Sequence, residues 1–187
     1  LPVMVFDKEK TDHPQLAVKD SDFKEDDPKE FITYYKDHKT DQMSRMVKYL
    51  KSWCDHKRES MPSGLSMTVL ALNHYLPNDR DDVALKFLLI EIESALNSKF
   101  ECIMPTTPKD DLFADFSETK RDNFLNNLKD FIADAKAAVD EDNQLKASKL
   151  WKKHLGERFP EGEDKNDGKS SSSSLRSAAG TSRPYYR

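Results

Sequence analysis

The stretch MPSGLSMTVLALNHYL, residues 61–76, constrains the fold more than any other part of the chain. Placed on a helix, it leaves almost no polar face, because apolar side chains point in nearly every direction: Leu65, Met67, Val69, Leu70, Ala71 and Leu72. A helix that is apolar all round is buried in the middle of a protein. We therefore expect several other helices to surround this one.

Two such helices are expected before it. Asp27 and Pro28 match the preferences for the N-cap and the first position of a helix, and Phe31, Ile32 and Tyr35 then share one face. A second helix begins at Thr40 or Asp41 and carries an apolar stripe with gaps of three and four residues: Met43, Met46, Val47, Leu50, Trp53 and Cys54.

Three more helices are expected after it. One covers residues 82–97, with these buried candidates: Val83, Phe87, Ile90 and Ala95. Ser117 caps a long helix that buries a second set: Phe124, Leu125, Leu128, Phe131, Ile132, Ala135 and Val139. The last spans about Glu141–Leu155 and ends at Gly156, a residue type favoured just beyond helix ends. The predicted fold class is mainly α, a bundle of about five to six helices led by one strand.

That leading strand is the apolar run LPVMVF, residues 1–6, which we expect to be covered on both faces. A lone strand leaves its backbone groups without partners, so we expect it to complete a sheet supplied by sequence upstream of Leu1. A polar loop with a short element at Gln15–Val18 would follow. The expected domains are 1–27, strand and loop; 28–160, the helical domain; and 161–187, a flexible Ser-rich tail.

Composition narrows the function classes. The net charge of −4 and the pI near 5.8 argue against a protein that binds duplex nucleic acid. Two cysteines, Cys54 and Cys102, fit a reducing cytoplasm rather than a disulfide framework. No stretch reaches the roughly 18 apolar residues of a membrane span, and no signal peptide is apparent at Leu1.

Metal sites are not expected within the chain. Cys54, Asp55 and His56 lack the second pair of ligands that a zinc site needs. Three acidic pairs lie in turns or at helix starts, where Asp is favoured for capping: Asp26–Asp27, Asp81–Asp82 and Asp110–Asp111. We interpret them as structural.

The strongest chemical signal joins Lys51 to Ser63. Ser63 precedes Gly64 and the buried helix, so it is expected to be the N-cap, where free N–H groups and the helix dipole favour an anion. A short antiparallel turn would bring Lys51 close to this end, and Arg45 and Lys48 would extend the basic surface. The alternative is that the lysines are solvated and Ser63 is only a cap.

Six strings, in this order, resemble the C-terminal half of bacterial cGAS/DncV-like nucleotidyltransferases, the CD-NTases of CBASS anti-phage signalling: RMVKYLKSWCDHK, MPSGLSMTVLALNHY, RDDVALKFLLIEI, FECIMPTTPKDDLF, KRDNFLNNL and ASKLWKKHLGERFP. The resemblance covers residues 1 to about 160. It implies a polymerase-β-like nucleotidyltransferase core followed by an OAS-like helical domain. Such enzymes join ATP, GTP or other nucleoside triphosphates into cyclic di- or trinucleotide second messengers, with two Mg²⁺ ions held by three carboxylates.

The resemblance also implies roles for individual residues. Lys51 and Ser63 match the lysine and serine that hold the donor triphosphate, and Asp110 lies in a loop that borders a nucleobase pocket. The residue after the serine is aromatic in animal relatives, but it is Gly64 here. LPVMVF resembles the strand that follows the third metal-binding aspartate, so the catalytic carboxylates are expected upstream of Leu1. The chain by itself is then expected to be inactive.

Further expectations concern partners. The resemblance implies a cytoplasmic protein whose tail a ubiquitin-ligase-like partner conjugates, although such tails end in a small residue and this chain ends in Arg187. The alternative is a disordered tail that only makes the protein more soluble. Two other functions stay open: a non-catalytic helical interaction module, and a nucleotide-sensing domain. The sequence does not decide which nucleotides are joined, the ring size, the activating signal or the oligomeric state.

Overall fold

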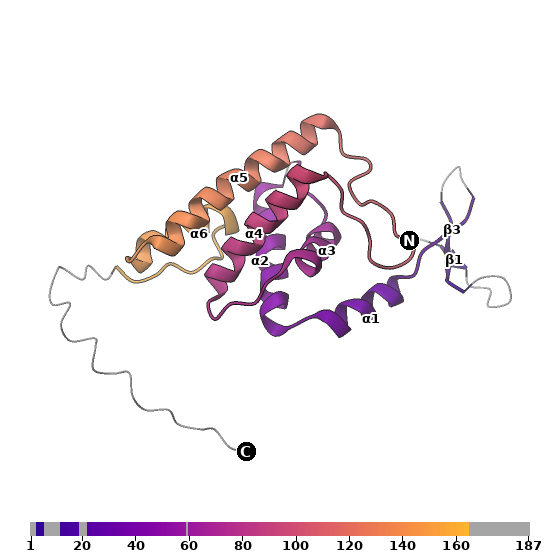
Figure 1. Ribbon diagram of the computed structural model, residues 1–187, viewed down its shortest axis with the longest axis horizontal. Helices are drawn as coiled ribbons and strands as arrows, with labels where there is room; N and C mark the ends of the chain where they lie inside the picture. The colour runs from indigo at the N-terminus through magenta and orange to yellow at the C-terminus, as the bar shows by residue number, and fades with distance from the viewer. Residues whose placement is uncertain (1–2, 6–11, 19–21, 59, 165–187) are drawn as a thin grey trace, which may run out of the picture.

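The computed structural model describes residues 3–5, 12–18, 22–58 and 60–164. A small three-stranded sheet lies at one end of the molecule, and a helical bundle makes up the rest (Figure 1). The elements are β1 Met4–Val5, β2 Gln15–Leu16, β3 Lys24–Glu25, α1 Pro28–His38, α2 Asp41–Lys57, α3 Gly64–His74, α4 Asp81–Ser98, α5 Glu118–Asp140 and α6 Gln144–Leu155. The prediction of a mainly α fold with about six helices is confirmed.

The helices begin where the sequence places caps. Side-chain oxygens of five cap residues accept hydrogen bonds from backbone N–H groups in the first turns of α1, α2, α3, α5 and α6: Asp27, Thr40, Ser63, Ser117 and Asn143. Each such cap contributes about 1 kcal/mol to helix stability. Asn143 caps α6, so this helix begins at Gln144, three residues later than the expected start at Glu141.

The core forms around α2 and α3, as the apolar patterns predict. All six residues of the α2 stripe are buried, and so are Ser66 to Ala71 of α3. Trp53 is fully buried, with its ring centroid 5.1 Å from Phe131 and 5.9 Å from Phe124 on α5. The long helix α5 packs against α4 and α6, which closes the bundle (Figure 1).

Some burial predictions are wrong. Phe87 on α4 is 43% exposed, and Ile32 on α1 is 51% exposed. Leu65 is 40% exposed, so the first turn of α3 reaches the surface although the rest of the helix is buried. In α5, Ala138 is buried while Val139 is half-buried. The other three candidates on α4, Val83, Ile90 and Ala95, are half-buried. The buried stripe of α4 consists of other residues: Ala84, Leu85, Leu88, Leu89, Ile92 and Leu96.

The leading strand differs from its prediction. β1 pairs antiparallel with β2, and β2 pairs antiparallel with β3, so the strand finds partners within the chain. Val3, Met4 and Val5 are exposed rather than covered on both faces. The short element expected at Gln15–Val18 exists as β2. Leu1, Pro2 and Phe6 of the expected strand lie outside the described residues.

Side-chain hydrogen bonds join helices that are distant in sequence. Arg45 on α2 pairs with Asp81 at the start of α4, with Nη2 2.9 Å from Oδ1. The Ser52 hydroxyl on α2 donates to the carbonyl of Leu155 at the end of α6, at 2.9 Å. Residues 161–164 lie against α6, because Gly162 N–H donates to Ser148 Oγ at 2.8 Å. The rest of the expected tail lies outside the described residues. No described helix is long and apolar enough to cross a membrane.

Candidate functional site

A cavity of about 930 Å³ opens where α2 ends, α3 begins and α6 ends. Lys51, His56 and Arg58 line it from α2 and its C-cap, Gly64 lines it from α3, and Arg158 lines it from the turn after α6. We call it the basic cavity. Two segments that are far apart in the sequence, the end of α2 and the turn after α6, therefore contribute cationic side chains to the lining of one cavity.

The start of α3 and the side chain of Lys51 lie in contact. A methyl group added at Gly64 would lie 3.3 Å from Cε of Lys51 and 3.6 Å from its Cδ. Gly64 therefore leaves the room in which the lysine stem crosses the first turn of α3. The far end of the lysine stem therefore lies close to the first turn of α3, and the free N–H groups of that turn favour a bound anion.

Ser63 caps α3 as expected. Its hydroxyl oxygen accepts from Ser66 N–H at 3.1 Å, and it lies 2.8 Å from the Ser66 hydroxyl. Ser63 is exposed but is not among the residues that line the basic cavity. Its hydroxyl is already used in the cap, so the contribution to an anion site comes from the helix start that it fixes.

Arg45 and Lys48 are not brought to the basic cavity. The Arg45 guanidinium forms a two-pronged ion pair with Asp81, and hydrogen bonding to Asp81 raises the pKa of Arg45. The same contact lowers the pKa of Asp81. Lys48 is exposed on α2 and does not line the cavity. Phosphate contacts from these two side chains stay a prediction, and neither side chain lines the basic cavity.

Asp110 lies apart from the basic cavity, in the loop before α5. Its carboxylate pairs with Lys24 on β3, and its carbonyl accepts from Met104 N–H at 2.8 Å. Its neighbour Asp111 accepts from the N–H groups of Cys102 and Phe113. These bonds order the loop, and Asp111 is structural, as the sequence predicts.

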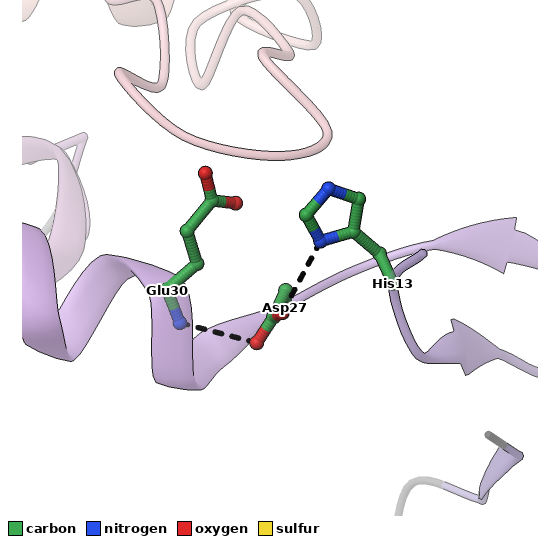
Figure 2. A group of neighbouring side chains, drawn as sticks. All are labelled: His13, Asp27 and Glu30. Atoms are coloured by element: carbon green, nitrogen blue, oxygen red, sulfur yellow. Dashed lines mark hydrogen bonds and ion pairs between the residues drawn. The ribbon is translucent and has the colours of Figure 1, made fainter. Parts of the chain in front are cut away.

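A second group of titratable side chains lies at the start of α1. His13, Asp27 and Glu30 have ligand atoms within 4.8 Å of one another (Figure 2). His13 Nδ1 lies 3.2 Å from Asp27 Oδ2, and Asp27 Oδ1 accepts from the N–H groups of Lys29 and Glu30. Glu30 Oε2 accepts from Thr107 N–H at 2.9 Å. We call this group the α1 cluster.

The α1 cluster does not fit the metal centre of a nucleotidyltransferase. That chemistry needs carboxylates that face one another across two metal ions, whereas this group contains one imidazole and two carboxylates. Asp27 is the helix cap, and the positive end of the α1 dipole disfavours a cation. Sequence analysis missed the cluster, because fourteen residues separate His13 from Asp27 and no spacing motif connects them.

The two cysteines are structural. Burial raises the pKa of each thiol to about 12, so both stay protonated at neutral pH. Cys54 lines the basic cavity beside Asp55 and His56, but a buried protonated thiol is a poor metal ligand. That these three residues form no zinc site stays a prediction from the sequence.

Comparisons with known proteins give the fold. No family model matches the chain. Its structure is similar to that of Vibrio cholerae DncV, a cyclic AMP-GMP synthase described as a prokaryotic cGAS homolog. The TM-score is 0.73 at 17% sequence identity, over 85% of this chain and 47% of that one.

Complexes of DncV with nucleotides match as well. The structure bound to ATP and GTP gives a TM-score of 0.67 at 17% identity, over 78% of this chain and 41% of that one. The structure bound to the linear intermediate pppA(3′,5′)pG gives 0.63 at 18% identity, over 79% and 41%. The chain thus spans less than half the length of these proteins, and the likeness is one of fold.

Proposed function

We propose that this chain is the helical lobe of a nucleotidyltransferase that makes cyclic di- or trinucleotides, and that the basic cavity binds the donor triphosphate. The observation that carries the proposal is the Lys51 side chain lying across Gly64 at the start of α3, at the edge of a cavity of about 930 Å³. The fold shared with a cyclic dinucleotide synthase supports it.

The chemical role of the lobe is to bind and orient. The Lys51 ammonium neutralises phosphate oxygens as a point charge, and the N–H groups of the first turn of α3 donate to them. Ser63 fixes that turn through its cap. Holding the triphosphate in one orientation against the reacting hydroxyl is itself a large part of the catalysis of phosphoryl transfer.

Mg²⁺ is expected to assist the reaction by stabilising the charge on the transferring phosphates. The described residues offer no set of three facing carboxylates, and the α1 cluster does not fit that role. We propose, from the resemblance, that a nucleotidyltransferase core outside this chain holds the metal. Asp110 as a contact for a nucleobase also remains a proposal.

The wider role rests on resemblance alone. It includes cyclic nucleotide signalling in anti-phage defence, use of ATP and GTP as substrates, a cytoplasmic location and conjugation of the C-terminal tail. We propose these together with the catalytic function. A nucleotide-sensing domain would share the same binding site, whereas a purely structural helical module would not bind nucleotides.

The direct test is calorimetric titration of ATP and GTP into the 187-residue chain, its Lys51→Ala variant and a matched control. Lys129→Gln removes one exposed lysine on α5, outside the basic cavity. We expect Lys51→Ala to weaken ATP binding about tenfold, the loss of one charge-assisted contact, and Lys129→Gln to have no effect. Equal affinity in all three proteins would remove Lys51 from the site.

A second assay separates binding from catalysis. Incubated with Mg²⁺ and the four nucleoside triphosphates, the chain alone is expected to form no cyclic product, although it binds ATP. Detection of a cyclic nucleotide by mass spectrometry would mean that catalytic carboxylates are present in this chain.

A further inference from the structure

The basic cavity contains two arginines that the triphosphate proposal does not use. Arg58 is the residue that ends α2, and Arg158 lies two residues beyond the C-cap of α6. They are 100 residues apart in the sequence, yet both line the same cavity as Lys51. No spacing motif predicts that they line one cavity.

Contacts between α2 and α6 hold together the two segments that carry the arginines. The Ser52 hydroxyl donates to the Leu155 carbonyl at 2.9 Å, which fixes the end of α6 on α2. Gly156 has φ +84°, and a methyl group there would lie 3.1 Å from Nδ1 of His56. Phe159 N–H then donates to the Gly156 carbonyl at 3.0 Å, so Arg158 sits in a closed turn.

The charges of these side chains are not neutralised within the part of the chain that the structure describes. Lys51, Arg58 and Arg158 form no ion pair with another described residue, whereas Arg45, Arg80 and Lys152 each pair with a carboxylate. The lining also includes Asp55 and Glu157, but Glu157 is bonded to Lys152 at 2.8 Å. Three cations therefore face one uncommitted carboxylate, in a protein whose net charge is −4.

A neighbouring pocket indicates how a ligand would lie in the basic cavity. It has a volume of about 440 Å³, and Lys51 and Leu65 line both it and the basic cavity. Its other walls include Phe31 and Tyr35 of α1, together with the exposed Lys36 and Lys39. Lys51 thus lies between an aromatic-lined pocket and the cavity that the two arginines line. This arrangement suits a ligand with a flat ring at one end and phosphates at the other.

We propose that Arg58 and Arg158 form a second anion subsite, which binds the terminal phosphates of the nucleotide and the pyrophosphate that its reaction releases. This inference rests on the proposed function, because Lys51 and the start of α3 would hold the phosphates nearer the sugar. Arginine suits such a subsite because its planar fork bonds two phosphate oxygens at once. The arginines would then select triphosphates over monophosphates.

The backbone conformation of Arg58 allows a substitution that removes the side chain without straining the fold. Arg58 has φ 56° and ψ −73°, a strained conformation for a residue with a side chain, and one that glycine adopts without strain. Arg58→Gly therefore removes the guanidinium without adding backbone strain. Its stability in urea is expected to be no lower than that of the wild type, so any loss of binding reports on the side chain.

The test is titration of ATP, AMP and pyrophosphate into the 187-residue chain and into Arg58→Gly, Arg158→Gln, Lys51→Ala and Lys129→Gln. We expect each arginine variant to weaken binding of ATP and pyrophosphate about tenfold, and to change AMP binding less than about twofold. Arg158→Lys should recover part of the loss, because it restores the charge but not the fork.

The outcomes separate the two proposals. If both arginine variants bind ATP and pyrophosphate as tightly as Lys129→Gln while Lys51→Ala binds weakly, the subsite is wrong and the proposed function stands. If AMP binding falls as much as ATP binding in the arginine variants, the arginines do not select terminal phosphates. If the unaltered chain binds neither ATP nor pyrophosphate, both proposals fail.

Discussion

The basic cavity and the α1 cluster both gather titratable side chains from distant parts of the chain, but they use them differently. In the basic cavity, Lys51, Arg58 and Arg158 surround empty space and have no carboxylate partner among the described residues. In the α1 cluster, Asp27 caps a helix and bonds His13, and Glu30 bonds the backbone of Thr107. Charged side chains that form hydrogen bonds or ion pairs within the chain hold its segments together, whereas charged side chains without such partners are available to a ligand.

The contrast also explains Arg45. Sequence reasoning placed it with Lys51 because both lie on α2, but Arg45 is committed to Asp81 and ties α2 to α4. A cation on the expected helix is therefore a candidate for ligand binding only after its partners within the chain are known. Pairing across 36 residues is a tertiary property that no local pattern contains.

The largest expected effect comes from a substitution at the junction of α2 with α6, beside the basic cavity. Gly156→Ala forces a side chain onto a backbone at φ +84° and against the His56 ring. We expect a loss of about 2–3 kcal/mol in the free energy of unfolding, measured in urea, together with weaker pyrophosphate binding as Arg158 shifts. Unchanged stability would mean that this junction does not position the cavity.

Two histidines, one on α6 and one in the α1 cluster, should respond to pH in opposite directions. Burial lowers the pKa of His154, even though its bond to Asp134 opposes the shift. The unfolded chain therefore takes up the proton first as pH falls below about 6.5, and the stability that neutral His154 provides is lost on acidification.

The bond to Asp27 instead raises the pKa of His13. Its contribution is fully present below about pH 6.5 and is lost as pH rises through the raised pKa. Urea unfolding of His154→Gln, His13→Asn and the unaltered chain, from about pH 5 to pH 8.5, measures both directions. Parallel pH profiles for the three proteins would contradict the assignment of opposite shifts.

Gly64→Ala should give the smallest effect, and it should change ATP affinity without lowering stability. The new methyl group would press on Cε of Lys51, the far end of a flexible side chain that can move aside. Alanine is the better helix former, so stability should not fall, while ATP affinity should drop about threefold as the ammonium leaves the start of α3. A fall in stability with unchanged ATP affinity is the opposite of this expectation.

Local patterns predicted the helices and one half of the site. The gaps of three and four in α2 identified its buried stripe down to Trp53 and Cys54, and the caps marked where the helices begin. Lys51 and Gly64 could be placed together because only a short turn separates α2 from α3. The fold class and the centre of the site follow from such short-range signals.

Contacts between segments that are distant in the sequence could not be predicted from these local patterns. The two arginines line one cavity because α6 ends against α2, and β1 pairs with β2 in a small sheet with its residues exposed. Phe87 shows the same limit: it is apolar and was expected to be buried, but α4 buries the face that carries Leu85, Leu88 and Ile92, and Phe87 is 43% exposed.

Chemical-shift mapping with ATP tests the central claim most directly. The ¹⁵N-labelled 187-residue chain would be titrated with ATP while amide resonances from both regions are followed in one experiment. We predict that the amides of Gly64, Leu65, Arg58 and Arg158 shift in proportion to ATP bound, while those of Glu30 and Thr107 stay in place. Shifts confined to the α1 cluster, or none at saturating ATP, would contradict the assignment of the basic cavity as a triphosphate site.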